Sequence, residues 1–167
     1  MPPLTIRIKK KSDGSAALSC VRADGSTTWQ RQLGASGRFF PIHDLTHYAV
    51  ETELRLRRGF YGLLSEGWDI DDFGAPWPKG PMPPESGHAE LIVGFFDTDR
   101  AGGTRSTAEE FNTSAASFVA ATGGTPPPAL TDADVARIRL RLSDLLAGWR
   151  ETQVGEAFEL VFDPDQE

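Results

Sequence analysis

Two Asp-Gly pairs, Asp13-Gly14 and Asp24-Gly25, divide the beginning of the chain into short segments. The segments before, between and after these pairs alternate apolar and polar residues or are rich in β-branched ones. An Asp-Gly pair between such segments is a strong hairpin signal, because both residues tolerate the left-handed backbone of a tight turn. We therefore expect residues 1–36 to form an antiparallel β-meander of three strands.

The middle of the chain is expected to be helical. Pro41 suits the first turn of a helix that continues to about Arg57 without a breaker, and a shorter helix covers residues 60–66. Together they form a helical segment, residues 41–67. Residues 68–87 are rich in proline, glycine and aspartate and include two tryptophans, which predicts a long ordered loop or a lid.

Three more helices are expected within residues 88–150, followed by a strand at residues 156–163. Ser106 and Thr107 begin two overlapping capping boxes, and Thr131 is a third helix-capping residue. The final strand most simply returns to the N-terminal meander.

These elements indicate an α+β fold, with an antiparallel sheet packed against four or five helices. The chain of 167 residues is long enough for one domain with a real core and too short to expect two. We therefore treat residues 1–167 as a single domain. A mainly helical bundle with a β-hairpin appendage is the alternative.

The charge and the cysteine content exclude several classes of protein. The net charge of -7 argues against nucleic-acid binding, which normally requires a basic excess. No apolar run approaches the ~20 residues that a membrane helix needs, and the N-terminus lacks a signal-peptide pattern. The single cysteine, Cys20, cannot form an internal disulfide. We therefore expect a cytoplasmic protein in which Cys20 is buried on a strand.

The segment His43-Asp44-Leu45-Thr46-His47 carries the clearest chemical signal. In a helix, two histidines four residues apart point the same way, and apolar residues on the same stripe would shield them from water. Shielding favours the neutral imidazole, which is the form that binds metals. The same spacing holds zinc in His-Glu-x-x-His metalloproteases, where the residue after the first histidine is the base. Here that residue is Asp44.

A two-histidine pair needs a third ligand, and two candidates stand out. Glu66 could reach the pair because two glycines let the second helix fold back, and His88 lies on an inward-facing stripe of its own helix. Glu51 is a poor third ligand, since its Cα lies ~12 Å along the helix axis from that of His43. Asp44 and Glu51 are instead candidate catalytic carboxylates.

Two alternatives to a metal site remain open. The histidines could be hydrogen-bonded core groups that bind no metal. If Asp44 were the N-cap of the helix, the pair would no longer share a face.

The motif also resembles the zinc-binding signature of the coenzyme Q biosynthesis scaffold family, a largely helical group. The resemblance covers His43, Asp44, His47 and a following glutamate, Glu66. It departs from that family because eighteen residues separate His47 from Glu66, a longer interval than the family has, and because the β-meander has no counterpart there. What the resemblance implies is metal binding.

We therefore predict a small protein with a divalent zinc, manganese or iron ion on the histidine helix. Such an ion would support metal-assisted hydrolysis or a lyase reaction on a small molecule. The alternative is a non-catalytic interaction or assembly protein whose acidic surface meets a partner protein. The oligomeric state stays open.

Overall fold

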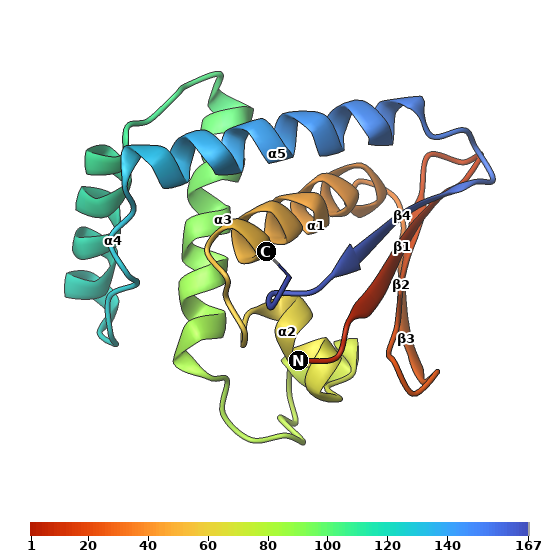
Figure 1. Ribbon diagram of the computed structural model, residues 1–167. Coiled ribbons are helices and arrows are strands. Elements are labelled where there is room, and N and C mark those ends of the chain that lie inside the picture. Colours follow the sequence, from red (N-terminus) through yellow and green to blue (C-terminus); the bar gives the residue numbers. More distant parts are fainter. Residues whose placement is uncertain (167) are drawn as a thin grey trace.

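In the computed structural model, which describes residues 1–166, the N-terminal segment forms a sheet with the last strand of the chain (Figure 1). All neighbouring strands are antiparallel, and their order is β3-β2-β1-β4. The strands are β1 (Leu4–Lys10), β2 (Ala16–Val21), β3 (Thr27–Gln32) and β4 (Ala157–Phe162). The predicted meander is confirmed, and β4 does return beside β1.

The alternating pattern of the strands decides which face of the sheet is buried. Ile6 and Ile8 of β1 are fully buried, whereas Arg7 between them points to solvent. Ile6 pairs with Cys20 of β2, which lies on the same buried face. Burial raises the pKa of the Cys20 thiol to about 12, so this cysteine behaves as a small core residue.

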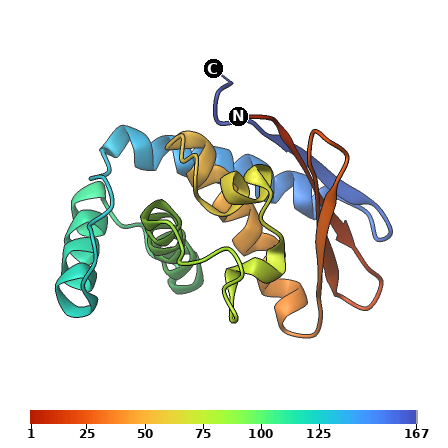
Figure 2. The same cartoon turned by 90° about the horizontal axis from the view of Figure 1, so that it is seen from below.

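Helix α1 lies at the centre of the molecule, between the sheet, α3 and α5, and α4 packs on the side of α3 that faces away from the sheet (Figures 1 and 2). The helices are α1 (Ser36–Glu53), α2 (Phe60–Glu66), α3 (Pro84–Gly102), α4 (Ala108–Thr122) and α5 (Asp132–Glu151). The predicted α+β class is therefore confirmed. Among the described residues, no helix has both the length and the apolar character needed to cross a bilayer.

Of the predicted capping residues, Thr107 and Thr131 cap helices, whereas the hydroxyl of Ser106 donates to Asp99 instead. Thr107 and Glu110 form a reciprocal capping box at the start of α4, and Thr131 and Asp134 form one at the start of α5. Each box satisfies backbone N–H groups that the first helical turn leaves without partners.

The bounds of the histidine helix differ from those predicted. It begins at Ser36, so Pro41 lies inside the helix, and it ends at Glu53. The end is a Schellman motif: the N–H of Leu56 donates to the carbonyl of Glu51, and Arg55 takes the left-handed conformation at φ 52°. Glycine normally occupies that position, and its absence explains why the sequence suggested a longer helix.

The predicted loop at residues 68–87 is ordered and contains a short 3-10 helix, η1 (Ile70–Phe73), and α3 already begins within it at Pro84. Arg22 of the segment after β2 anchors the loop, donating to the carbonyls of Leu64 and Trp68 and pairing with Asp69 at 2.9 Å. The N–H of Ile70 donates to the hydroxyl of Thr28 on β3. These contacts hold η1 against the sheet edge nearest the histidine helix.

Candidate metal site

His43 and His47 occupy successive turns of α1 and lie on one face of it. Asp44 lies inside the helix and is not its N-cap, so the two histidines do not diverge as they would if the helix began there. Their rings meet edge to face with centroids 4.7 Å apart. The side chain of His47 is only 2% exposed, whereas that of His43 is 19% exposed. Both rings point toward α3.

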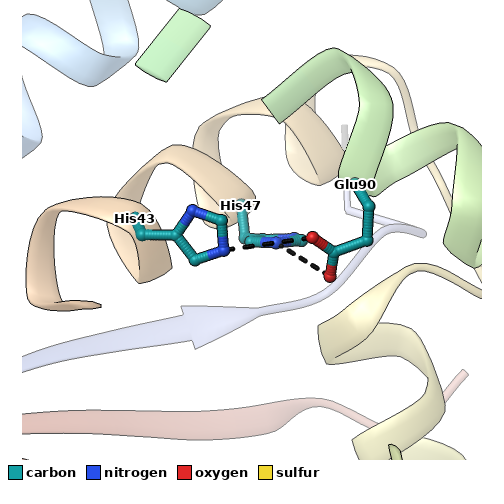
Figure 3. Close-up of side chains that lie close together, drawn as sticks. All are labelled: His43, His47 and Glu90. Atoms are coloured by element: carbon teal, nitrogen blue, oxygen red, sulfur yellow. Dashed lines mark ion pairs between the residues drawn. The ribbon is translucent and has the colours of Figure 1, made fainter. Parts of the chain in front are cut away.

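Glu90 of α3 meets the two imidazoles, as Figure 3 shows. Its carboxylate lies 3.3 Å from Nε2 of His47 and 3.9 Å from Nε2 of His43. The three ligand atoms all lie within 4.8 Å of one another. Two ligands bound ~2.1 Å from one ion at a tetrahedral angle lie about 3.4 Å apart. The three side chains could therefore hold a metal ion after a small adjustment of Glu90, which is half exposed.

The opposite ring nitrogens of the two histidines face carboxylates. Nδ1 of His43 lies 2.6 Å from Asp97, and Nδ1 of His47 lies 2.9 Å from Glu51. Arg100 holds the second oxygen of Asp97 at 2.8 Å. Carboxylates in this position fix the ring orientation and the tautomer of metal-binding histidines, and they make the remaining nitrogen a better ligand.

Glu51 is fully buried and is held by the start of α2. It accepts hydrogen bonds from the backbone N–H groups of Phe60 at 2.8 Å and Tyr61 at 3.0 Å. This approach requires Gly59, because a Cβ there would lie 2.5 Å from the carboxyl carbon of Glu51. The glycine between the helices thus brings the beginning of α2, and not its end at Glu66, to the histidine helix.

The pKa values of His47, Glu90 and Asp97 are each set by two opposing effects: burial disfavours the charged form, and oppositely charged neighbours favour it. Burial acts to lower the pKa of His47, but hydrogen bonds to Glu51 and Glu90 and the charges of both carboxylates raise it to about 10. Burial acts to raise the pKa values of Glu90 and Asp97, and hydrogen bonds to His47 and His43 outweigh it, so both are lowered. A metal ion would take the place of the proton on His47, so binding would release a proton.

Asp44 is a fourth carboxylate close to the two imidazoles, besides Glu90, Asp97 and Glu51. It is 5% exposed, and the side-chain amide of Gln32 donates to its Oδ2 at 2.6 Å. Burial raises the pKa of Asp44 to about 6, although Gln32 and the nearby histidines act against that shift. A carboxyl group whose pKa is raised toward neutral pH is suited to general acid-base work.

A cavity of about 370 Å³ opens beside the two histidines. Its walls come from β3, α1, α2, η1 and α3. The lining residues are Gln30, Phe40, His43, Asp44, His47, Phe60, Ile70, Asp71, Phe73, Gly74 and Glu90. The three potential ligands and Asp44 therefore face one space that a small molecule can enter.

The structure brings together some of the predicted site residues and not others. His43, His47 and Asp44 lie at the cavity, and Glu51 stands behind His47 without lining the cavity. Glu66 instead pairs with Arg58 at 3.1 Å. His88 contacts the carbonyl of Thr125 at 3.0 Å, so neither Glu66 nor His88 belongs to the His43–His47–Glu90 group.

Sequence analysis missed Glu90 and Asp97, the two acidic residues of α3 that complete the site. They are seven residues apart, which places them on one face of the helix beside buried Val93. The sequence shows the spacing that places the two acids on one helix face. Nothing in the sequence, however, indicates which of the 24 acidic residues would face the histidines.

Comparison of the chain with known protein families, with curated proteins and with solved structures finds no match. The resemblance to the coenzyme Q biosynthesis scaffold family therefore stays a prediction. The function has to be inferred from the geometry of the site.

Proposed function

We propose that this protein is a metal-dependent enzyme that uses His43, His47 and Glu90 to bind a divalent ion, with zinc, manganese and iron as candidates. The observation that carries the proposal is the orientation of the imidazoles. Both Nε2 atoms converge with Glu90 at a cavity, while a buried carboxylate contacts each Nδ1 on the opposite side of the ring. Two histidines and one carboxylate suit zinc hydrolases and non-haem iron sites, which leave positions open for water and substrate.

Hydrolysis or a lyase reaction is the chemistry that these residues would support. A bound divalent ion would supply Lewis acidity at one wall of the cavity. Asp44 would accept and return a proton at its Oδ1, because Gln32 already occupies Oδ2. Asp97 and Glu51 would keep the two imidazoles oriented throughout. Phe60, Ile70 and Phe73 would limit the access of water.

Metal analysis of the untagged protein tests the binding part of the proposal. We expect close to one equivalent of a divalent metal by elemental analysis, and a rise in thermal stability when the metal-free protein is loaded. Glu90→Gln should weaken the affinity at least ~100-fold, because one of three ligands is lost. Glu90 is half exposed, so this variant should fold normally.

The chain offers matched controls for this experiment. Glu66→Gln changes the same residue type at a surface ion pair, and His88→Ala removes a histidine outside the group. Both variants should retain metal at the wild-type level, whereas His43→Ala should lose it. Wild-type affinity in Glu90→Gln, or no stoichiometric metal in any preparation, would support buried structural histidines in a non-catalytic protein instead.

A second variant tests the catalytic part. Asp44→Asn should retain the metal but lose turnover of esters and amides screened as substrates, since Asn cannot accept the proton. Turnover by Asp44→Asn equal to that of the wild type, with the same metal content, would remove Asp44 from the mechanism.

A further inference from the structure

The cavity is lined by acidic side chains without lysine or arginine to balance them. Asp44, Asp71 and Glu90 line it, and its lining contains no lysine or arginine. Arg100 and Arg22 are each held by other groups: Arg100 pairs with Asp97, and Arg22 donates to backbone carbonyls and Asp69. Asp71 is an acidic side chain of the lining that the proposed metal site does not use. A phosphorylated or polycarboxylate ligand would therefore find no lysine or arginine in the lining to bind it.

Two of the acidic residues that line the cavity have carboxylate oxygens without a hydrogen-bond partner among residues 1–166. Asp71 is exposed on η1 and has no hydrogen-bond or ion-pair partner among residues 1–166. Asp44 is 5% exposed, and its Oδ1 likewise has no protein partner among those residues. A nearly buried carboxylate with one free oxygen toward a cavity is suited to receive a donor from a ligand.

Aromatic rings make up much of the remaining lining. Phe40 borders the cavity on the side of His43, and Phe60 and Phe73 border it on the side of His47. The ring centroids of Phe60 and Phe73 are 5.0 Å apart, so the two form a continuous wall. Phenyl rings attract organic cations through their quadrupole, and acidic residues beside them add to that attraction.

From these features we propose that the substrate of the site is a small organic cation: an amine or quaternary ammonium compound with an apolar body. The cationic group and the apolar body would both lie against the rings of Phe60 and Phe73, with the cationic group on the side of Asp71. The cavity volume of about 370 Å³ fits a compound of roughly one ring and a short chain. This inference rests on the proposed metal-dependent function, because it assigns the substrate of that same site.

Three probes with one phenyl ring each test the charge preference. Benzyltrimethylammonium, benzyl alcohol and benzenesulfonate are titrated at low salt into protein that has been incubated with a divalent metal, with binding followed by ligand-observed NMR. We expect the cation to bind at least ~10-fold more tightly than the alcohol, and the sulfonate to bind more weakly than either. Equal affinity for the cation and the alcohol, or a preference for the sulfonate, would overturn the proposal.

Variants separate the cavity from general surface charge. Asp71→Asn should weaken binding of the cation by roughly three- to tenfold and leave the affinity for benzyl alcohol unchanged. The matched control is Asp144→Asn, which makes the same change at an exposed position of α5 outside the cavity and should alter neither affinity. Phe73→Leu should weaken binding of both probes. An unchanged cation affinity in Asp71→Asn would contradict the assigned orientation.

Metal content is measured on the same samples, so the two proposals can fail separately. Metal-loaded protein without a cation preference would refute the substrate class and leave the metal site intact. A cation preference in protein that never binds metal would refute the proposed function and leave the cavity assignment standing.

Discussion

Helix α3 carries two largely buried aspartates two residues apart, Asp97 and Asp99, and only the hydrogen-bonded cluster of Asp97 reaches the cavity. Asp99 accepts hydrogen bonds from the hydroxyl of Thr104 at 2.8 Å, from the N–H and hydroxyl of Ser106 and from Arg139 at 3.0 Å. Asp97 pairs with Arg100 and with Nδ1 of His43.

The hydrogen-bonded cluster of Asp99 does not reach the cavity, since none of its partners Thr104, Ser106 and Arg139 lines it. It closes the connection from α3 to α4 and ties that connection to α5. The cluster of Asp97 continues through His43 to Glu90, and both border the cavity. Buried polar residues therefore occur at structural and candidate functional positions alike, and the open end toward a cavity distinguishes the second kind.

The largest effect should come from Glu51, which is behind the metal ligands and fully buried. Glu51→Gln removes the carboxylate charge that two backbone N–H groups and His47 contact. The loss should lower the free energy of unfolding of the metal-free protein by about 3–5 kcal/mol. Denaturant unfolding in the presence of a chelator measures this. Glu53→Gln on the same helix changes an ion pair with two half-exposed or exposed arginines and should cost under about 1 kcal/mol. Equal losses in the two variants would contradict the assigned role of Glu51.

The second effect contrasts the two aspartates directly. Asp97→Asn keeps the shape of the side chain but removes the charge that orients His43, so metal affinity should fall about 10–100-fold. Asp99→Asn should leave metal affinity within about twofold of wild type, since its cluster does not reach the histidines. Competition with a chromophoric chelator gives both constants. A similar loss of affinity in both variants would remove the distinction between the clusters.

The smallest effect concerns the stability of the Asp99 cluster and its dependence on pH. Burial acts to raise the pKa of Asp99, but hydrogen bonds from Ser106, Thr104 and Arg139 outweigh it and lower the pKa below its ordinary value of 3.8. A lowered pKa in the folded state stabilises the fold above the unfolded value, and this contribution is lost as the pH falls. Asp99→Asn should therefore destabilise the protein by about 1–2 kcal/mol at pH 7.

Acid unfolding of the two proteins provides the corresponding measurement. The stability difference between wild type and Asp99→Asn should be constant from pH 7 to about pH 5 and should shrink below about pH 4. A difference that grows on acidification would mean that the carboxylate of Asp99 is not ionised in the folded protein.

Local patterns were sufficient for the secondary structure and for half of the site. The Asp-Gly turns, the capping residues Thr107 and Thr131 and the period-two alternation of β1 are each set by residues close in sequence, and all were predicted. The shared face of His43 and His47 likewise depends only on one helix. The predicted end of α1 was wrong because Arg55 adopts the left-handed backbone conformation that glycine usually takes after a helix.

The third ligand was decided by how the helices pack. Glu66 and Glu90 are both helical glutamates downstream of the histidines, and their side chains carry the same chemistry. Glu90 reaches the imidazoles because α3 crosses α1 at that level, whereas α2 presents its beginning to α1 and directs Glu66 to Arg58. Sequence spacing determines which residues share a face of one helix, since the helical repeat is local. Which helix faces meet depends on how apolar surface is buried over the whole chain. Only the tertiary structure decides this.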